Sequence, residues 1–104
     1  MLLINVKINK NKNGVIRSTK YCDLLKQGRV DTDRSASAIE KIYVKELGRT
    51  EIRFAYYKKT ANNRDRLVLR PLDLDEDELL ELFDNAVKNE VFSENFRKKL
   101  KEIL

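Results

Sequence analysis

Apolar and polar side chains alternate at the start of the chain. The apolar members of residues 2–9 are Ile4, Val6 and Ile8. A period of two is typical of a strand with one buried face. Asn13 and Gly14 follow, and both residue types tolerate the positive φ angles of tight turns. We therefore predict a strand over residues 2–9, a turn, and a returning strand over residues 15–21.

The next segment has no clear apolar rhythm. Residues 23–28 contain two adjacent leucines and end at Gly28, which is typical of one helical turn closed by a glycine. Residues 29–37 are polar and mixed in charge. We predict a single helical turn followed by a loop.

Residues 38–47 fit two structures. A helix would align a stripe of apolar side chains, with Ser37 and Glu40 spaced as a capping box and Gly48 as its stop. A strand is favoured by the run from Ile42 to Val44, rich in residues that pack well on a sheet. We favour the strand, in a hairpin that places Ile42 and Val44 opposite Ile52 and Phe54, while the helix stays open as the alternative.

Two further strands follow. In residues 51–58, Ile52, Phe54 and Tyr56 alternate with a second set of side chains, which predicts a strand. Residues 59–65 form a polar loop, and residues 66–72 alternate again. Because Pro71 cannot donate a ladder hydrogen bond, we place it at the end of this strand or on an edge.

The last third of the chain is helical in pattern. Asp75 and Glu78 have the spacing of a capping box, and a helix runs from there to about residue 89. Its apolar stripe comprises Leu79, Leu82, Phe83, Ala86 and Val87. A second helix starts at Ser93, and its stripe comprises Phe96, Leu100, Ile103 and Leu104. Val91 and Phe92 fill the joint between the two helices.

These elements predict an α+β fold: a mostly antiparallel, four- or five-stranded sheet packed by two C-terminal helices. The helical pair is expected to bury its apolar stripe against one face of the sheet. The length of 104 residues suits one domain. Within it, residues 1–72 form a basic sheet portion and residues 73–104 an acidic helical pair.

Charge is divided unevenly between these portions. Residues 1–70 hold 17 Lys and Arg against 7 Asp and Glu, whereas residues 71–104 hold 5 against 10. A basic sheet with aromatic side chains is one route to nucleic-acid binding, because cations neutralise phosphates and rings stack on bases. The candidate residues are Arg49, Arg53, Tyr56, Tyr57, Lys58, Lys59, Arg64, Arg66 and Arg70.

Other interpretations compete with nucleic-acid binding. The same residues can form a solvated, charged face whose only role is to keep the domain soluble. An acidic protein is another partner class. Self-association is a third, because a basic half and an acidic half can meet across a two-fold axis, through a sheet edge or the C-terminal helices.

Composition argues against most catalytic classes. The chain has no histidine and one cysteine, Cys22, which excludes Ser-His-Asp and Cys-His catalysis and zinc sites of Cys and His. Its three glycines are too far apart for a phosphate-binding loop. Only a metal-dependent nuclease stays open, because Glu51-Ile52-Arg53 resembles the Glu-x-Lys element of one nuclease superfamily, with arginine in place of lysine. We expect a non-enzymatic module without a cofactor, a metal or a small-molecule ligand.

The single cysteine also bears on the compartment. With Cys22 alone, the chain forms no internal disulfide, which fits a reducing environment. The apolar N-terminus is interrupted at once by Asn5 and Lys7, and no stretch approaches the roughly 20 apolar residues of a membrane span. We therefore expect a cytoplasmic protein that has no membrane partner.

Overall fold

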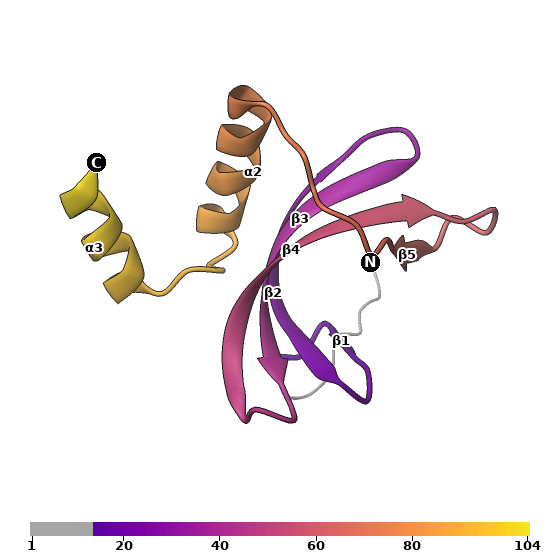
Figure 1. Ribbon diagram of the computed structural model, residues 1–104, viewed down its shortest axis with the longest axis horizontal. Coiled ribbons are helices and arrows are strands. Elements are labelled where there is room, and N and C mark those ends of the chain that lie inside the picture. The colour runs from indigo at the N-terminus through magenta and orange to yellow at the C-terminus, as the bar shows by residue number, and fades with distance from the viewer. Residues whose placement is uncertain (1–13) are drawn as a thin grey trace, which may run out of the picture.

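The protein is an α+β fold built on one five-stranded antiparallel sheet, as predicted (Figure 1). The computed structural model describes residues 14–104, so the strand predicted for residues 2–9 lies outside the described part. The strands follow chain order across the sheet: β1 (Arg17–Ser18), β2 (Cys22–Asp31), β3 (Ser35–Val44), β4 (Arg49–Lys59) and β5 (Asp65–Leu67). Two helices follow, α2 (Glu76–Lys88) and α3 (Glu94–Ile103).

Strand β2 overturns two predictions. The helical turn of residues 23–28 and the loop of residues 29–37 are both wrong, because β2 and β3 occupy these segments and leave a short turn between Asp31 and Ser35. The sequence concealed the strands because their charged side chains form ion pairs. Arg29 pairs with both Asp31 and Asp65. Gly28 is not a helix stop, since it lies within β2 beneath helix α2.

Strand β3 confirms the preferred interpretation of residues 38–47, although the hairpin register differs from the prediction. Ile39 lies opposite Phe54 and Lys41 opposite Ile52, whereas Ile42 faces Glu51. The turn that joins the strands occupies residues 45–48 and includes Gly48 at φ 65°. Val44 therefore pairs directly with Arg49. Since side chains alternate along a strand, this register places Ile42 on the face of the sheet opposite to Ile52 and Phe54, the residues it was predicted to accompany.

The sheet has two different faces. Gly28, Ile39 and Phe54 lie on the face that helix α2 covers, here called the helix face. The opposite face, here called the curled face, carries Ala38 and Tyr57. The sheet curls toward this second face, so that β1 and β5 approach each other across it. Arg17 of β1 donates a hydrogen bond to Tyr57 of β4 at 3.0 Å, and Arg29 of β2 reaches Asp65 of β5.

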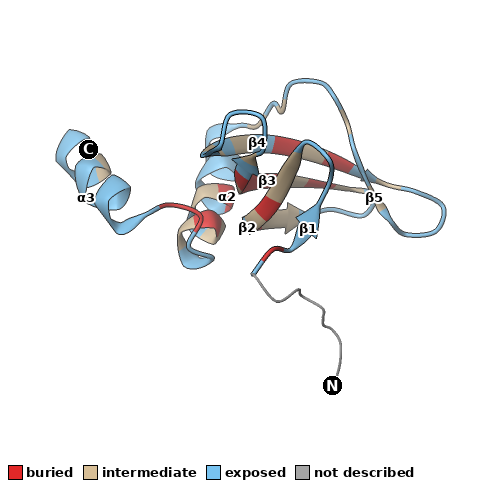
Figure 2. Cartoon of the chain, turned by 90° about the horizontal axis from the view of Figure 1, so that it is seen from below, coloured by how far each residue is buried: buried red, intermediate tan, exposed pale blue. Residues whose placement is uncertain are grey.

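Helix α2 supplies the main core. Leu82 and Ala86 are buried against Ile39 of β3, and Val91 and Phe92 close the same cluster from the joint, as predicted (Figure 2). The predicted capping box is present: Asp75 accepts from the backbone of Glu78, whose side chain accepts from the backbone of Asp75. The helix therefore begins where its orphan amides are satisfied.

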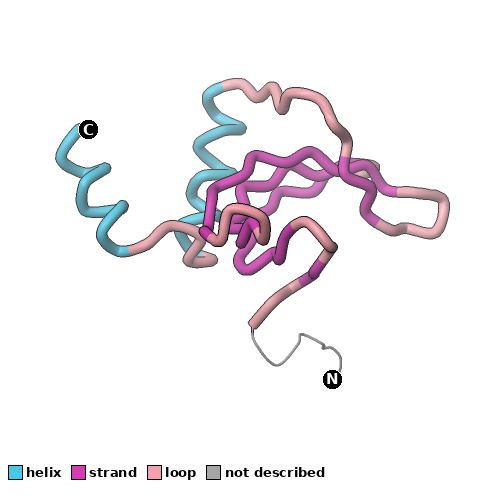
Figure 3. Tube along the Cα trace, turned by 60° about the horizontal axis from the view of Figure 1, so that its bottom comes forward, coloured by secondary structure: helices cyan, strands magenta, loops and turns pink. Residues whose placement is uncertain are grey.

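Helix α3 differs from expectation. Its start near Ser93 is as predicted, and the Ser93 hydroxyl accepts a hydrogen bond from Phe96 N. The helix lies apart from the sheet in Figure 3 and contacts no strand. None of its residues is buried. Only α2 buries its stripe on the helix face, so the prediction for the pair holds for one helix of the two.

The two edge strands of the sheet are shorter than predicted. Residues 15–21 contain only the two-residue strand β1. The strand predicted for residues 66–72 is the three-residue strand β5, which ends at Leu67. Pro71 follows the strand. In residues 14–104, neither helix has the length and apolar character needed to cross a membrane.

The closest approach between helix and sheet generates a prediction about stability. A Cβ atom added to Gly28 would lie 2.4 Å from Ala86 Cα and 2.5 Å from Ala86 N. Because these are backbone atoms, α2 must move away from β2. We expect Gly28→Ala to lower the free energy of unfolding by about 2–3 kcal/mol, measured by urea denaturation. Adding Ala86→Gly should not restore stability, since the clashing backbone atoms stay; recovery in that double variant would contradict the assignment.

Candidate nucleic-acid interface

The nine candidate residues do not share one face. Strand β4 alternates, so Arg53, Tyr57 and Lys59 lie on the curled face while Tyr56 and Lys58 lie on the helix face. The remaining four are Arg49 at the start of β4, Arg64 in the turn before β5, Arg66 in β5, and Arg70 beyond it. The surroundings of these side chains differ, and the carboxylates near each cation decide whether it is available to a ligand.

The curled face is organised around a buried carboxylate. Glu40 of β3 has no exposed surface. Its Oε1 accepts from Arg53 Nε at 2.9 Å, and its Oε2 accepts from Gln27 Nε2 and from the Tyr57 hydroxyl, each at 2.7 Å. A buried charge is stable only when it is paired and hydrogen-bonded, and both carboxylate oxygens of Glu40 have such partners. Arg53 and Tyr57 are therefore committed to the structure.

These contacts also shift proton affinities. Burial raises the pKa of Tyr57 from its ordinary value near 10 to about 12, and its hydrogen bond to Glu40 adds to the shift. Burial acts against the charge of Arg53, but the hydrogen bonds and attraction of Glu40 outweigh it and leave the pKa of Arg53 raised. Both side chains keep their protons across the physiological range.

A second group of ion pairs joins β2 to β5. Arg29 donates to both oxygens of Asp65, at 2.6 and 2.8 Å, and also contacts Asp31. The hydrogen bonds from Arg29 hold the pKa of Asp65 below its usual value. The Nζ atom of Lys59 lies 3.7 Å from Oδ1 of Asp31, and Nη2 of Arg49 lies 2.7 Å from Oε2 of Glu51. Three of the candidate cations, Arg49, Arg53 and Lys59, are thus matched by carboxylates within the chain.

The other candidate cations are not matched. Lys58, Arg64, Arg66 and Arg70 have no carboxylate within salt-bridge distance among residues 14–104. Lys58 and Arg66 lie opposite each other in the β4–β5 ladder. Arg70 lies with its guanidinium carbon 4.8 Å from the centre of the Tyr56 ring. We call Tyr56, Lys58, Arg64, Arg66 and Arg70 the outer cluster.

Tyr56 links this cluster to the tip of the neighbouring hairpin. Hydrogen bonds with Ser35 and with Arg70 lower the pKa of Tyr56 below its ordinary value. Arg34 is exposed in the turn between β2 and β3, and its carbonyl oxygen accepts a hydrogen bond from Lys59 N. This bond places Arg34 beside the outer cluster. The sequence contained no signal for Arg34, because its position follows from hairpin pairing.

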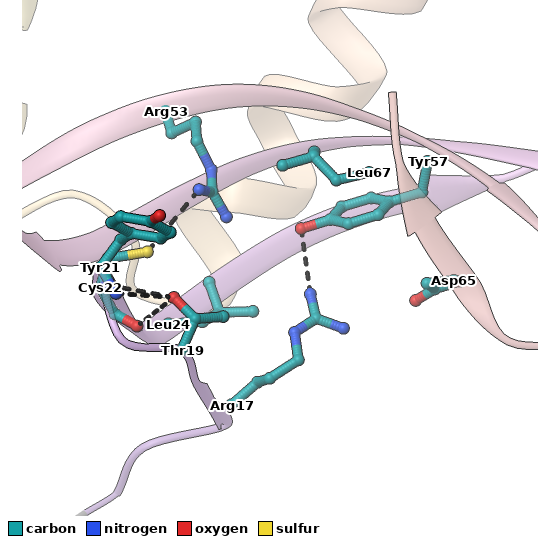
Figure 4. Close-up of a pocket in the computed structure, with 9 residues that line it drawn as sticks. All are labelled: Arg17, Thr19, Tyr21, Cys22, Leu24, Arg53, Tyr57, Asp65 and Leu67. Carbon is teal, nitrogen blue, oxygen red and sulfur yellow. Dashed lines mark hydrogen bonds between the residues drawn. The ribbon is translucent and has the colours of Figure 1, made fainter. Parts of the chain in front are cut away.

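The curl also creates a pocket that the sequence did not predict (Figure 4). Its volume is about 430 Å³. Leu24 and Leu67 supply apolar wall, and the guanidinium groups of Arg17 and Arg53 project into it. Arg17 donates to the Tyr57 hydroxyl and has no carboxylate partner in the part of the chain that the structure describes. No sequence pattern could identify this pocket, because Arg17 and Leu67 meet only when the sheet curls.

The two charged side chains of the nuclease-like element lie in separate ion pairs. Glu51 is paired with Arg49, and Arg53 points to Glu40. No group of three or more His, Cys, Asp or Glu side chains in residues 14–104 is arranged to hold a metal ion. The thiol of Cys22 is free and lies 3.8 Å from Arg53 Nη1.

Comparisons of the chain with protein-family models, curated proteins and solved structures found no match.

The buried network predicts a large difference between two glutamates. Glu40→Ala leaves the partly buried Arg53 without its carboxylate and Tyr57 and Gln27 without their acceptor, so we expect a loss of about 3 kcal/mol of unfolding free energy in urea denaturation. Glu51→Ala is the matched control, because its pair with Arg49 is exposed and should cost less than about 1 kcal/mol. Equal losses would show that Glu40 is not the organising group.

Tyr57 predicts a pH dependence. Its pKa is raised in the folded protein, to about 12, so the unfolded chain loses this proton first. Its contribution to stability is therefore complete below pH 10 and declines as the pH rises from about 10 to about 12. In the folded protein, phenolate absorbance should show one of the four tyrosines titrating late, and Tyr57→Phe should remove that late step. Titration of all four together near pH 10 would contradict the prediction.

Proposed function

We propose that this protein binds single-stranded nucleic acid across the edge strand β5, with the outer cluster contacting the phosphates. The observation that supports this most is a group of four cations next to a tyrosine at one end of the sheet, none of which has a carboxylate partner within residues 14–104. Arginine and lysine side chains matched by internal carboxylates would gain little from a phosphate. Those of the outer cluster release counterions when a phosphate replaces water beside them.

The aromatic and planar groups of the cluster fit this partner. Tyr56 and Arg70 are stacked at 4.8 Å, and both a phenol ring and a guanidinium plane can support a nucleobase. Base stacking of this kind tolerates any sequence, because every base has a π face. We therefore expect binding with little sequence preference.

The pocket of the curled face favours a single strand over a duplex. Strand β5 carries Arg66 toward the outer cluster and Leu67 toward the pocket, so the two sites adjoin along one edge. A cavity of about 430 Å³ with apolar walls and guanidinium donors suits a flat, polar-edged ring. Only an unpaired base can leave its strand to enter such a cavity.

A binding role without catalysis is part of this proposal. The chain has no histidine to transfer protons near neutral pH, and the side chains of its nuclease-like element are held in separate ion pairs. Self-association is a second candidate role. It is favoured by a different observation, the exposed apolar stripe of helix α3.

The proposal predicts a salt-dependent interaction that depends on two named residues. We expect a labelled 20-nucleotide single strand to bind at low salt in fluorescence anisotropy, with log affinity falling linearly against log salt. Lys58→Ala/Arg66→Ala should weaken binding and reduce the steepness of that line by about 2, one unit for each lost phosphate contact. A duplex of the same length should bind more weakly than the single strand.

The control for this experiment removes the same charge elsewhere. Lys98 and Lys101 are exposed and lie in α3, which contacts no strand of the sheet. Lys98→Ala/Lys101→Ala should change affinity much less than Lys58→Ala/Arg66→Ala. The proposal is wrong if the wild type does not bind at low salt, or if both double variants weaken binding equally.

A further inference from the structure

Helix α3 presents an apolar surface that stays largely exposed in the described chain. Phe96, Ile103 and Leu104 are 46%, 79% and 91% exposed, and Leu100 lies between them on the same side. The helix is strongly amphipathic in sequence, and amphipathic helices of this length are stabilised mainly by packing their apolar face. A ten-residue helix with no buried residue therefore lacks the partner that its sequence calls for.

The helix face of the sheet also has an apolar surface that helix α2 leaves uncovered. Helix α2 covers β2 and β3 but does not reach β4. On the uncovered part, Ile52 and Phe54 are 43% and 55% exposed, and both point to the same side as the core residue Ile39. Contiguous apolar side chains beside an otherwise covered sheet face are typical of an interface.

The chain does not bring its own α3 to this surface. Phe92 is buried at the joint and stacks at 4.9 Å on Phe83, while Phe96 packs at 5.1 Å on Phe92. The backbone at Glu90 has φ 60°, which turns the chain sharply after α2. These contacts fix the start of α3 beside the end of α2 and direct the helix away from the sheet (Figure 1).

The charges of the two helices are complementary. Helix α2 carries five carboxylates and one lysine, whereas α3 carries four cations and two carboxylates. The exposed side of α2 places Leu80, which is 68% exposed, among Asp77, Glu81 and Asp84. A helix with an apolar stripe flanked by Arg97 and Lys99 would fit beside it. A second copy of this chain has such a helix.

We propose that two copies of the chain form a two-fold dimer by exchanging α3, with the apolar stripe of each α3 packed on Ile52 and Phe54 of the other copy, next to its α2. One contact, repeated by the symmetry axis, covers both exposed surfaces of both copies. Isologous contacts of this kind close on themselves and so do not lead to larger assemblies. The dimer does not depend on nucleic-acid binding.

The test is the mass in solution of the full chain, measured by light scattering after size-exclusion chromatography over a range of concentrations. We expect a species of twice the 12.3 kDa of one chain. Phe54→Glu and Ile103→Glu should each give a monomer whose circular dichroism matches the wild type, because both side chains are largely exposed within one chain. Leu69→Glu is the control. It introduces the same charge at a side chain that is 91% exposed and lies outside the proposed contact, and it should leave the dimer intact.

Mixing the two monomeric variants distinguishes exchange from other dimers. The Phe54→Glu chain keeps an intact α3, and the Ile103→Glu chain keeps an intact β4, so an equimolar mixture should regain a dimer through one native contact. An interface made of β4 against β4 or of α3 against α3 would not recover. A wild type that is monomeric at every concentration, variants that stay dimeric, or a mixture that stays monomeric would each overturn the proposal.

Discussion

A carboxylate with no exposed surface determines how this small sheet holds together and which of its charges face a partner. Glu40 binds Gln27 of β2, Arg53 and Tyr57 of β4, and through the Tyr57 hydroxyl it reaches Arg17 of β1. Four strands thus share one hydrogen-bonded group. A charge removed from water is very unfavourable unless its partners are complete, so the network specifies the register of these strands as well as their contact. It also commits Arg53 to an internal role and reduces the positive charge available on the curled face.

The two proposals concern the cations that this network does not pair and the apolar side chains that helix α2 does not cover. Apart from Arg17, which is hydrogen-bonded to Tyr57, the cations of the curled face are matched by carboxylates within the chain, and the surplus positive charge lies around the ladder of β4 and β5. Apolar surface shows a parallel surplus. Helix α2 covers two strands of the helix face, and the exposed side chains of β4 and α3 are the remainder. The surfaces available for function are therefore those that the monomer does not use, and they adjoin on the helix face of β4, where Tyr56 and Lys58 of the outer cluster follow the apolar patch at Ile52 and Phe54.

The errors in the sequence interpretation share one cause. Residues 23–37 contain few apolar residues and many charges, a pattern that predicts a helical turn and a loop, yet the segment lies in the paired strands β2 and β3 and the turn between them. Their stability comes from partners distant in sequence. Arg29 pairs with Asp65, and the Cβ-free surface of Gly28 admits Ala86 of α2. The register of the β3–β4 hairpin was missed for a related reason, because the length of the turn at residues 45–48 is decided by the pairing and not by local preference.

By itself, the sequence determined the α+β class, strand β4, both helices, the capping box of α2, and the buried joint at Val91 and Phe92, since each depends on periodicity or on side chains within a few residues of one another. It also determined the uneven charge of the chain. Only the tertiary structure decided which cations are free. The pleat of β4 sends Lys58 and Lys59 to opposite faces, and Asp31, which is far away in the sequence, matches one of them. The curl that brings Arg17 to Tyr57, and the direction in which α3 leaves the sheet, depend on packing between distant segments, which a local pattern does not encode.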